Sequence, residues 1–257
     1  MQVDINCDMG ESFGLYQIGD DAAIMPFITQ ANIACGFHGS DPNHMRRTVA
    51  LANTYGVKVG AHVSLPDLCG FGRREMKIDR EEMNNIILYQ IGALLAFLKL
   101  EDMTLSYLKP HGALYGMAAR QEHIAEAVAD AAALFSVPVT GISGTLHEEV
   151  CKRRGVGFQS EFFVDLDYDD EGHLIIAREH EAVAPELAAS RAVRAVRDGV
   201  LTTIGGRTLS VRAETICIHS DTPNAVKIGM AVNSALSQLA AAWEDGRTKR
   251  EKIHGQT

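Results

Sequence analysis

The stretch Asp4-Ile5-Asn6-Cys7-Asp8, close to the start of the chain, alternates acidic or amide side chains with apolar ones. Successive side chains of a β-strand point to opposite faces, so Asp4, Asn6 and Asp8 share one face and Ile5 and Cys7 the other. In a closed barrel the polar face would line the interior, where an unpaired carboxylate is costly to bury. The pattern therefore predicts the floor of a polar pocket. The alternative is an edge strand whose polar side chains meet solvent.

Six further apolar runs end in a short cluster of glycine, histidine, acidic or other polar residues. The clusters occupy 32–38, 60–62, 109–112, 141–143, 161–165 and 219–221. A helical pattern follows most of them, as expected of units that consist of a strand, a loop and a helix. The loops of such units meet at the carboxyl ends of parallel strands, where the pockets of α/β enzymes form. We therefore expect these clusters to build one active site.

The apolar patterns predict the order of the elements. Strands are expected over 2–7, 27–34, 57–62, 105–108, 138–142, 158–163 and 215–219, and helices over 20–25, 41–55, 79–98, 122–135, 143–155, 185–196 and 223–243. Two hairpins are expected around 169–172 and 204–207. Such units close most naturally into an α/β fold with one irregular seven-stranded β/α barrel over residues 1–246, followed by a charged, flexible tail over 247–257. An open doubly wound sheet is the alternative.

Composition excludes several classes of protein. The 257 residues carry a formal charge of −9 and show no basic stripe of the kind that nucleic-acid-binding domains have. The five cysteines have no metal-ligand spacing such as C-x-x-C, and the first residues lack the basic and apolar segments of a signal peptide. We expect a reduced, cytoplasmic protein that binds neither nucleic acid nor a membrane. The chain also lacks the phosphate-loop, G-x-G-x-x-G and G-x-S-x-G motifs, so it shows no nucleotide motif of its own.

Four of the ten histidines follow predicted strand ends, namely His38, His62, His111 and His219. Histidine is suited to proton transfer near neutral pH, and Asp8 and Glu161 are candidate partners in that chemistry. Two histidines and a carboxylate can also hold a divalent metal, and the candidates are Asp8, His38 and His62. The chain has no His-x-x-x-His pair, so structural histidines are the alternative.

Two cations are candidate anion-binding groups in this acidic chain. Lys109 stands at a strand end directly before Pro110, where it would face the pocket. Arg73 follows Gly70-Phe71-Gly72 in a loop that could close over an anionic ligand. The alternative is an ordinary surface loop with a solvated arginine.

Longer strings then carry a resemblance to a known family. They are Asp-Ile-Asn-Cys-Asp-Met-Gly-Glu at 4–11, Ala-Asn-Ile-Ala-Cys-Gly-Phe-His at 31–38, Lys-Pro-His-Gly-Ala-Leu-Tyr at 109–115 and Ile-Cys-Ile-His-Ser-Asp-Thr-Pro at 216–223. From Met1 to about Met230 the chain resembles the LamB/YcsF family. The resemblance implies a barrel of the glycoside hydrolase/deacetylase type. It also implies ATP-dependent opening of 5-oxoproline to L-glutamate together with two partner subunits, B and C.

The resemblance also implies which residues form the site. The catalytic candidates are Asp8, His38, His62, Lys109, His111 and Glu161, and the substrate-binding candidates are Asp4, Asn6, Glu11, Asn32, Asp67, Arg73, Asp165, His219 and Asp221. Leu166 stands where the family usually has an arginine, so a different lactam is an alternative substrate. Two other functions stay open: a stand-alone metal-dependent amidase or deacetylase, and a non-catalytic carboxylate-binding subunit. The sequence also leaves a homo-oligomer open.

Overall fold

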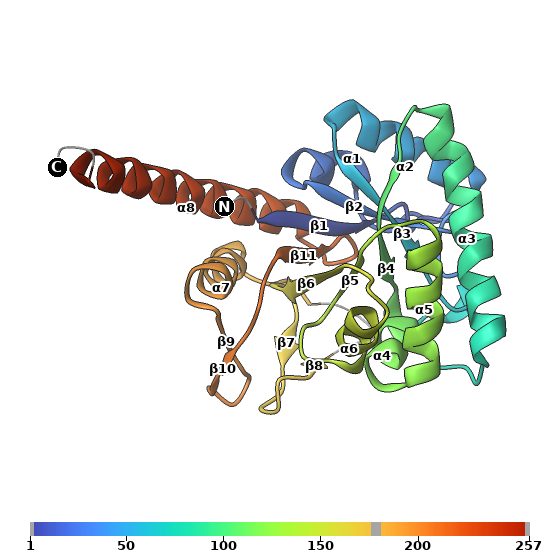
Figure 1. The fold of residues 1–257 in the computed structure, drawn as a ribbon. Helices are drawn as coiled ribbons and strands as arrows, with labels where there is room; N and C mark the ends of the chain where they lie inside the picture. Colours follow the sequence, from blue (N-terminus) through green and yellow to red (C-terminus); the bar gives the residue numbers. More distant parts are fainter. Residues whose placement is uncertain (1–2, 176–180, 255–257) are drawn as a thin grey trace.

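Seven parallel strands form a closed barrel in this computed structural model, which describes residues 3–175 and 181–254, with side chains as far as Glu244 (Figure 1). The order around the barrel is β1-β11-β6-β5-β4-β3-β2. The predicted β/α barrel is therefore confirmed, and the open sheet is excluded. The strands are β1 Asp4–Met9, β2 Gln30–Ala34, β3 Lys58–Val63, β4 Leu105–Pro110, β5 Val139–Gly141, β6 Phe158–Phe163 and β11 Thr215–His219.

Helices surround the barrel, as Figure 1 shows. They are α1 Asp21–Ile24, η1 Met25–Phe27, α2 Pro42–Tyr55, η2 Leu68–Gly70, α3 Arg80–Leu100, α4 Gly112–Arg120, α5 Glu122–Leu134, α6 Leu146–Arg153, α7 Pro185–Asp198 and α8 Ala225–His254. Both predicted hairpins are present, as β7 Asp167–Tyr168 with β8 Leu174–Ile175 and as β9 Val200–Thr202 with β10 Thr208–Ser210.

One helix was not predicted and several boundaries differ from the prediction, most of them by one to three residues. α4 was not predicted, because only Gln121, with extended backbone, separates it from α5. The cap of α6 is Thr145 rather than Ser143. α8 continues to His254 instead of ending at 243. The proposed division between barrel and tail at 246/247 stays a prediction, since the tail's side chains and residues 255–257 lie outside the described part.

The apolar core lies between the strands and the helices. Ile5 and Cys7 point outward from β1 and are buried, as the alternation predicts. α3 is long and apolar enough to cross a membrane by length and composition alone. Its buried face, which includes Ile87, Ile91 and Leu94, belongs to the same core, and α3 packs on α5 and β3. These contacts account for its apolar composition.

The barrel interior is polar instead of apolar. Asn6, Asn32 and Lys109 are almost fully buried there, beside the ring of Tyr107. The Tyr107 hydroxyl donates a hydrogen bond of 2.6 Å to Asn32 Oδ1. Gly60 makes room for this ring, because a Cβ at that position would lie 2.2 Å from it. A polar interior costs free energy unless its groups are paired, so the fold has built a connected network beneath the strand ends.

Candidate functional site

Parallel register brings the predicted residues together at the carboxyl ends of the strands. Asp8 on β1 lies opposite His219 on β11 and Asn32 on β2, and His62 on β3 lies opposite Lys109 on β4. All these side chains point inward because they occupy alternate positions on their strands. The barrel mouth therefore collects charged groups from strands that are far apart in the sequence.

Lys109 occupies the centre of this mouth, between two carboxylates. Its Nζ lies 3.0 Å from Asp8 Oδ1 and 3.1 Å from Glu161 Oε2, and all three side chains are buried. Asn6 Oδ1 accepts a further hydrogen bond from Nζ at 3.1 Å. Asn32 donates to Asp8 Oδ1 at 2.7 Å, which fixes that oxygen from the second side. Asp8 Oδ2 is left facing the imidazoles of His62 and His219, at 3.2 and 3.8 Å from their Nε2 atoms.

This pairing keeps both groups charged. Burial alone would raise the pKa of Asp8, but the charges of His62 and Lys109 hold that pKa well below its usual range. Burial alone would lower the pKa of Lys109, but Asp8 and Glu161 raise it well above its usual range. Lys109 is therefore a fixed cation, and it cannot serve as a neutral nucleophile or base near neutral pH.

Four buried groups next to this ion pair form what we call the histidine cluster, which consists of Glu11, His38, His62 and His111. One ligand atom from each lies within 4.8 Å of all the others. Glu11 Oε1 is 3.0 Å from His38 Nε2, 3.4 Å from His111 Nδ1 and 4.0 Å from His62 Nε2. The rings of His38 and His111 are stacked, with centroids 3.7 Å apart.

Burial shifts the pKa of three groups in the histidine cluster. It lowers the pKa of His38 and of His111 well below the usual range, and neighbouring imidazoles add to this effect. Burial, together with the charge of Asp8, raises the pKa of Glu11. His38 Nδ1 is buried and has no hydrogen-bond partner among the described residues. The predicted metal candidates His38 and His62 belong to this cluster, while Asp8 lies beside it.

The loop between β3 and α3 covers the histidine cluster. Phe71 has a left-handed backbone, unusual for a residue with a side chain, and its carbonyl accepts a hydrogen bond from His111 Nε2 at 2.9 Å. Gly72 must be a glycine, since a Cβ there would lie 2.8 Å from His38 Cβ and 2.9 Å from His111 Cδ2. The loop that the sequence predicts to close over a ligand therefore lies over the histidine cluster.

Arg73 and Asp67, both predicted to bind substrate, have different surroundings in this loop. Arg73 Nη2 lies 2.8 Å from Asp221 Oδ2, so that ion pair joins the loop to the segment after β11. The carboxylate of Asp67 caps η2 and is held by Arg74. The contacts of Asp67 are therefore those of a residue that shapes the loop.

His219 forms a second pair, with Asp165. His219 Nδ1 lies 3.1 Å from Asp165 Oδ1, and the backbone N–H of His219 donates to Asp165 Oδ2 at 2.7 Å. Burial lowers the pKa of His219, but the charge and hydrogen bond of Asp165, with Asp8 and Asp221, outweigh burial and raise that pKa to about 9. A protonated imidazole therefore faces the mouth at neutral pH.

A small cavity of about 50 Å³ lies in the middle of these groups. Ionisable side chains line one side of it, and aromatic and aliphatic side chains line the other. The polar side consists of Asp8, His62, Arg73, Lys109, His111 and His219, and the apolar side of Tyr115, Phe163, Leu166 and Leu174. The apolar lining was missed by sequence reasoning, which searched for ionisable residues. Leu166, where the family resemblance leads one to expect an arginine, makes this wall apolar. Glu161 does not line the cavity, since it lies against Lys109.

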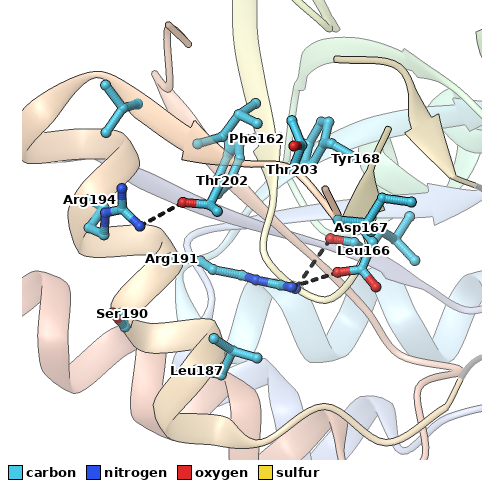
Figure 2. A pocket seen from close by; sticks show the side chains of 13 residues that line it. Phe162, Leu166, Asp167, Tyr168, Leu187, Ser190, Arg191, Arg194, Thr202 and Thr203 are labelled. Atoms are coloured by element: carbon cyan, nitrogen blue, oxygen red, sulfur yellow. Dashed lines mark hydrogen bonds and ion pairs between the residues drawn. The ribbon is translucent and has the colours of Figure 1, made fainter. Parts of the chain in front are cut away.

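A second cavity, of about 240 Å³, lies between α7 and the two hairpins (Figure 2). The Arg191 guanidinium points into it but is held by the backbone carbonyls of Val164 and Leu166 and by Asp167. None of the predicted catalytic residues lines this cavity. It lies outside the barrel mouth, and its arginine holds the segment after β6 in place.

The structure does not bring every predicted substrate-binding residue to the mouth. Asp4 is the first residue of β1 and lies at the opposite end of the barrel, where Thr29 and Lys58 bind its carboxylate. The alternation places Asp4 on the inner face correctly but says nothing about the end of the barrel. Asn6 and Asn32 lie beneath the cavity and orient Asp8 and Lys109.

Known proteins resemble this chain along nearly its whole length. Residues 3–250 match the LamB/YcsF family. The A subunit of 5-oxoprolinase from one strain of Thermus thermophilus is 45% identical over 93% of this chain and 97% of its own length, and that of Bacillus licheniformis is 43% identical over 91% and 94%. The crystal structure of a lactam utilization protein, also from Thermus thermophilus, matches with a TM-score of 0.87 at 43% identity, covering 93% of this chain and 98% of that one.

Proposed function

Since this chain belongs to the LamB/YcsF family, we propose that it is the hydrolytic subunit of a lactam-opening enzyme that converts 5-oxoproline to L-glutamate. The observation that carries the proposal is the fixed cation Lys109 beside the ionised Asp8, at a cavity that His219 also lines. These three groups supply the parts that amide hydrolysis needs. They are a base for water, a cation for the developing oxyanion and an acid for the leaving nitrogen.

The proposed chemistry follows from the contacts of each group. Asp8 Oδ2 accepts a proton from a water molecule, because Asp8 Oδ1 is already occupied by Lys109 and Asn32. The water oxygen bonds to the lactam carbonyl carbon, and Lys109 stabilises the negative charge on the carbonyl oxygen. The C–N bond then breaks while protonated His219 donates its proton to the nitrogen, which leaves the open-chain amino acid. Asp165 holds the His219 ring in the orientation for that transfer.

Substrate entry requires the cavity to enlarge. Small-molecule pockets are commonly about 300–1,000 Å³, much larger than the 50 Å³ seen here. The ion pair between Arg73 and Asp221 closes the covering loop over the mouth. When it opens, Arg73 is freed to bind the carboxylate of 5-oxoproline, and the apolar wall that includes Leu166 accepts the ring methylenes.

ATP and partner subunits complete the proposed reaction. The lactam amide is stabilised by resonance, and transfer of the ATP γ-phosphoryl group to its carbonyl oxygen would make the carbon a better electrophile. Water addition and C–N cleavage then leave an acyl phosphate at that carbon, and a second water releases inorganic phosphate and the carboxylate. This chain has no nucleotide motif, so we assign ATP binding to partner subunits B and C. In this scheme the barrel supplies water attack and proton transfer, and Lys109 and Arg73 attract the anionic intermediate.

The deciding experiment measures glutamate released from 5-oxoproline in four mixtures: the chain alone, the chain with ATP, subunits B and C with ATP, and the chain with ATP plus subunits B and C. We expect turnover only in the last mixture and a loss of turnover in the Asp8→Asn variant of this chain. Equal turnover by the partner subunits without this chain would refute the hydrolytic role.

A stand-alone metal-dependent amidase is the second candidate, and the histidine cluster favours it. Its donor set of three imidazoles and one carboxylate suits a divalent transition metal. Such a metal would polarise an amide carbonyl without ATP. Hydrolysis of simple amides by the isolated chain, stopped by a chelator and restored by metal, would select this function over the first.

A further inference from the structure

We propose that the histidine cluster binds one divalent first-row transition metal, whose ligands are Glu11 Oε1, His38 Nε2, His62 Nε2 and His111 Nδ1. The role of this metal in turnover rests on the proposed function, but its binding does not. The inference comes from how the four side chains are arranged. The site uses Glu11 and His111 in addition to His38 and His62. Asp8 is not one of the four donors: its Oδ1 is held by Lys109 and Asn32, and its Oδ2 lies beside the cluster, 3.2 Å from His62 Nε2.

Backbone contacts decide which ring nitrogens carry hydrogen. His62 Nδ1 lies 3.0 Å from the backbone carbonyl of Lys109, and His111 Nε2 lies 2.9 Å from that of Phe71. A carbonyl oxygen can only accept, so both nitrogens must be the protonated ones. When both rings are neutral, as metal ligation requires, their lone pairs lie on His62 Nε2 and His111 Nδ1.

These two lone pairs point at one another. His62 Nε2 and His111 Nδ1 are 3.0 Å apart, and Glu11 Oε1 lies 3.4 Å from the latter. Acceptors that face one another in a buried site repel unless a cation or a proton lies between them. Hydrogen bonds from the far nitrogens of metal-bound histidines to carbonyl groups are the arrangement that orients such ligands in known metal sites.

Four of the six donor–donor distances are compatible with one common ion. Two ligands about 2.1 Å from a zinc-like ion, at the tetrahedral angle, lie about 3.4 Å apart. The neighbouring donor pairs here are separated by 3.0 Å, 3.0 Å, 3.4 Å and 4.0 Å. Imidazole nitrogen is a poor ligand for magnesium or calcium, so the donor set selects zinc, nickel, iron or cobalt.

A bound metal explains this cluster better than a shared proton, because four donor atoms lie within 4.8 Å of one another. A proton between His62 and His111 satisfies one pair only, and it leaves Glu11 and His38 to pair separately. The covering loop also encloses the cluster tightly, since a Cβ on Gly72 would collide with His38 and His111. His62 and His111 line the cavity, so the ion would sit in its wall.

The test loads the chelator-treated full-length protein with Co²⁺ or Zn²⁺ and measures bound metal by mass spectrometry after gel filtration. We expect one equivalent, with visible Co²⁺ absorption bands typical of nitrogen ligation. His111→Gln and Glu11→Gln should each weaken binding by more than the roughly 10- to 100-fold that loss of a group hydrogen-bonded to a metal ligand causes. His173→Gln is the control, because that imidazole is 78% exposed and lies in the β7–β8 turn.

X-ray absorption of the metal-loaded wild-type protein counts imidazole ligands without any variant, and it guards against variants that fail to fold. We expect three imidazoles. Binding below about 0.2 equivalents at saturating metal, binding unchanged in both variants, or a spectrum with fewer than two imidazoles would each overturn the site. Because metal content is measured without substrate, failure of the lactam assay alone would count against the proposed function and not against this site.

Discussion

The barrel interior carries an aspartate and a lysine at each of its two ends. At the amino-terminal end Asp4 and Lys58 lie 3.2 Å apart, and the Lys58 side chain is 57% exposed. At the carboxyl-terminal end Asp8 and Lys109 lie 3.0 Å apart, and the Lys109 side chain is 2% exposed. The same residue types at nearly the same distance therefore occur in two different electrostatic settings.

Burial, and not residue type, separates the two ends. Water and salt screen the exposed pair, so its net contribution to stability is small. The buried pair is screened far less, and each of its charges must stay compensated. Lys109 consequently has two carboxylate partners and a fixed charge, which gives the carboxyl-terminal end a field that can act on a reacting group.

The largest expected difference between the two ends is the effect of removing the lysine. Lys109→Met leaves Asp8 and Glu161 buried side by side, so we expect the free energy of unfolding to fall by about 3–5 kcal/mol. Turnover with the partner subunits should fall by at least about 100-fold. Lys58→Met should change stability by less than about 1 kcal/mol and leave turnover unchanged. Chemical denaturation measures the free energy of unfolding, and steady-state kinetics measures turnover. Equal effects of the two variants would contradict the proposed difference between the two ends of the barrel.

The two aspartates of β1 provide the next comparison. Asp8→Asn removes the proposed base for water but keeps the shape of the side chain, so kcat should fall by about 100-fold or more. Asp4→Asn changes a group at the far end of the barrel and should leave kcat within about twofold of the wild type. A matching loss in the Asp4 variant would show that the far end takes part in the reaction.

The fold could be predicted from sequence because its signal is local. Alternating Ile5 and Cys7 marked an outward apolar face, and repeated strand-to-helix patterns indicated the barrel. α4 was not predicted, because a single residue, Gln121, separates it from α5, and glutamine is not a residue that typically ends a helix. Element boundaries are set by tertiary contacts as much as by propensity.

The site was predictable only in part because its geometry comes from register and backbone. The polar strand ends located the mouth, yet strand alternation could not say that Asp4 lies at the other end. The backbone carbonyls of Lys109 and Phe71 orient the rings of His62 and His111. Every residue has a backbone carbonyl, so the sequence could not predict these two contacts. The contribution of Leu174 to the cavity depends on how the β7–β8 hairpin folds back, which the sequence does not show.

Adjacent arginines in the covering loop give a smaller effect. Arg73 lines the cavity, while the side chain of Arg74 is 65% exposed and pairs with Asp67. Arg73→Met should raise KM for 5-oxoproline by roughly tenfold, because it removes a charged hydrogen-bond donor to the carboxylate. Arg74→Met should leave KM nearly unchanged. Similar KM values for the two variants would remove Arg73 from substrate binding.

The smallest expected effect is a shift in the pH profile and not a loss of maximal activity. Because the pKa of His219 is raised to about 9, its protonated form is present below that pH, and kcat/KM should fall as pH rises through about 9. Asp165→Asn removes the charge that raises this pKa while burial still lowers it, so the fall should move toward lower pH by at least about one unit. Asp169→Asn changes a similar but exposed pair with His173 and should leave the profile in place. If both variants keep the wild-type profile, another group donates the proton to the leaving nitrogen. His219 would then have only a structural role in lining the cavity.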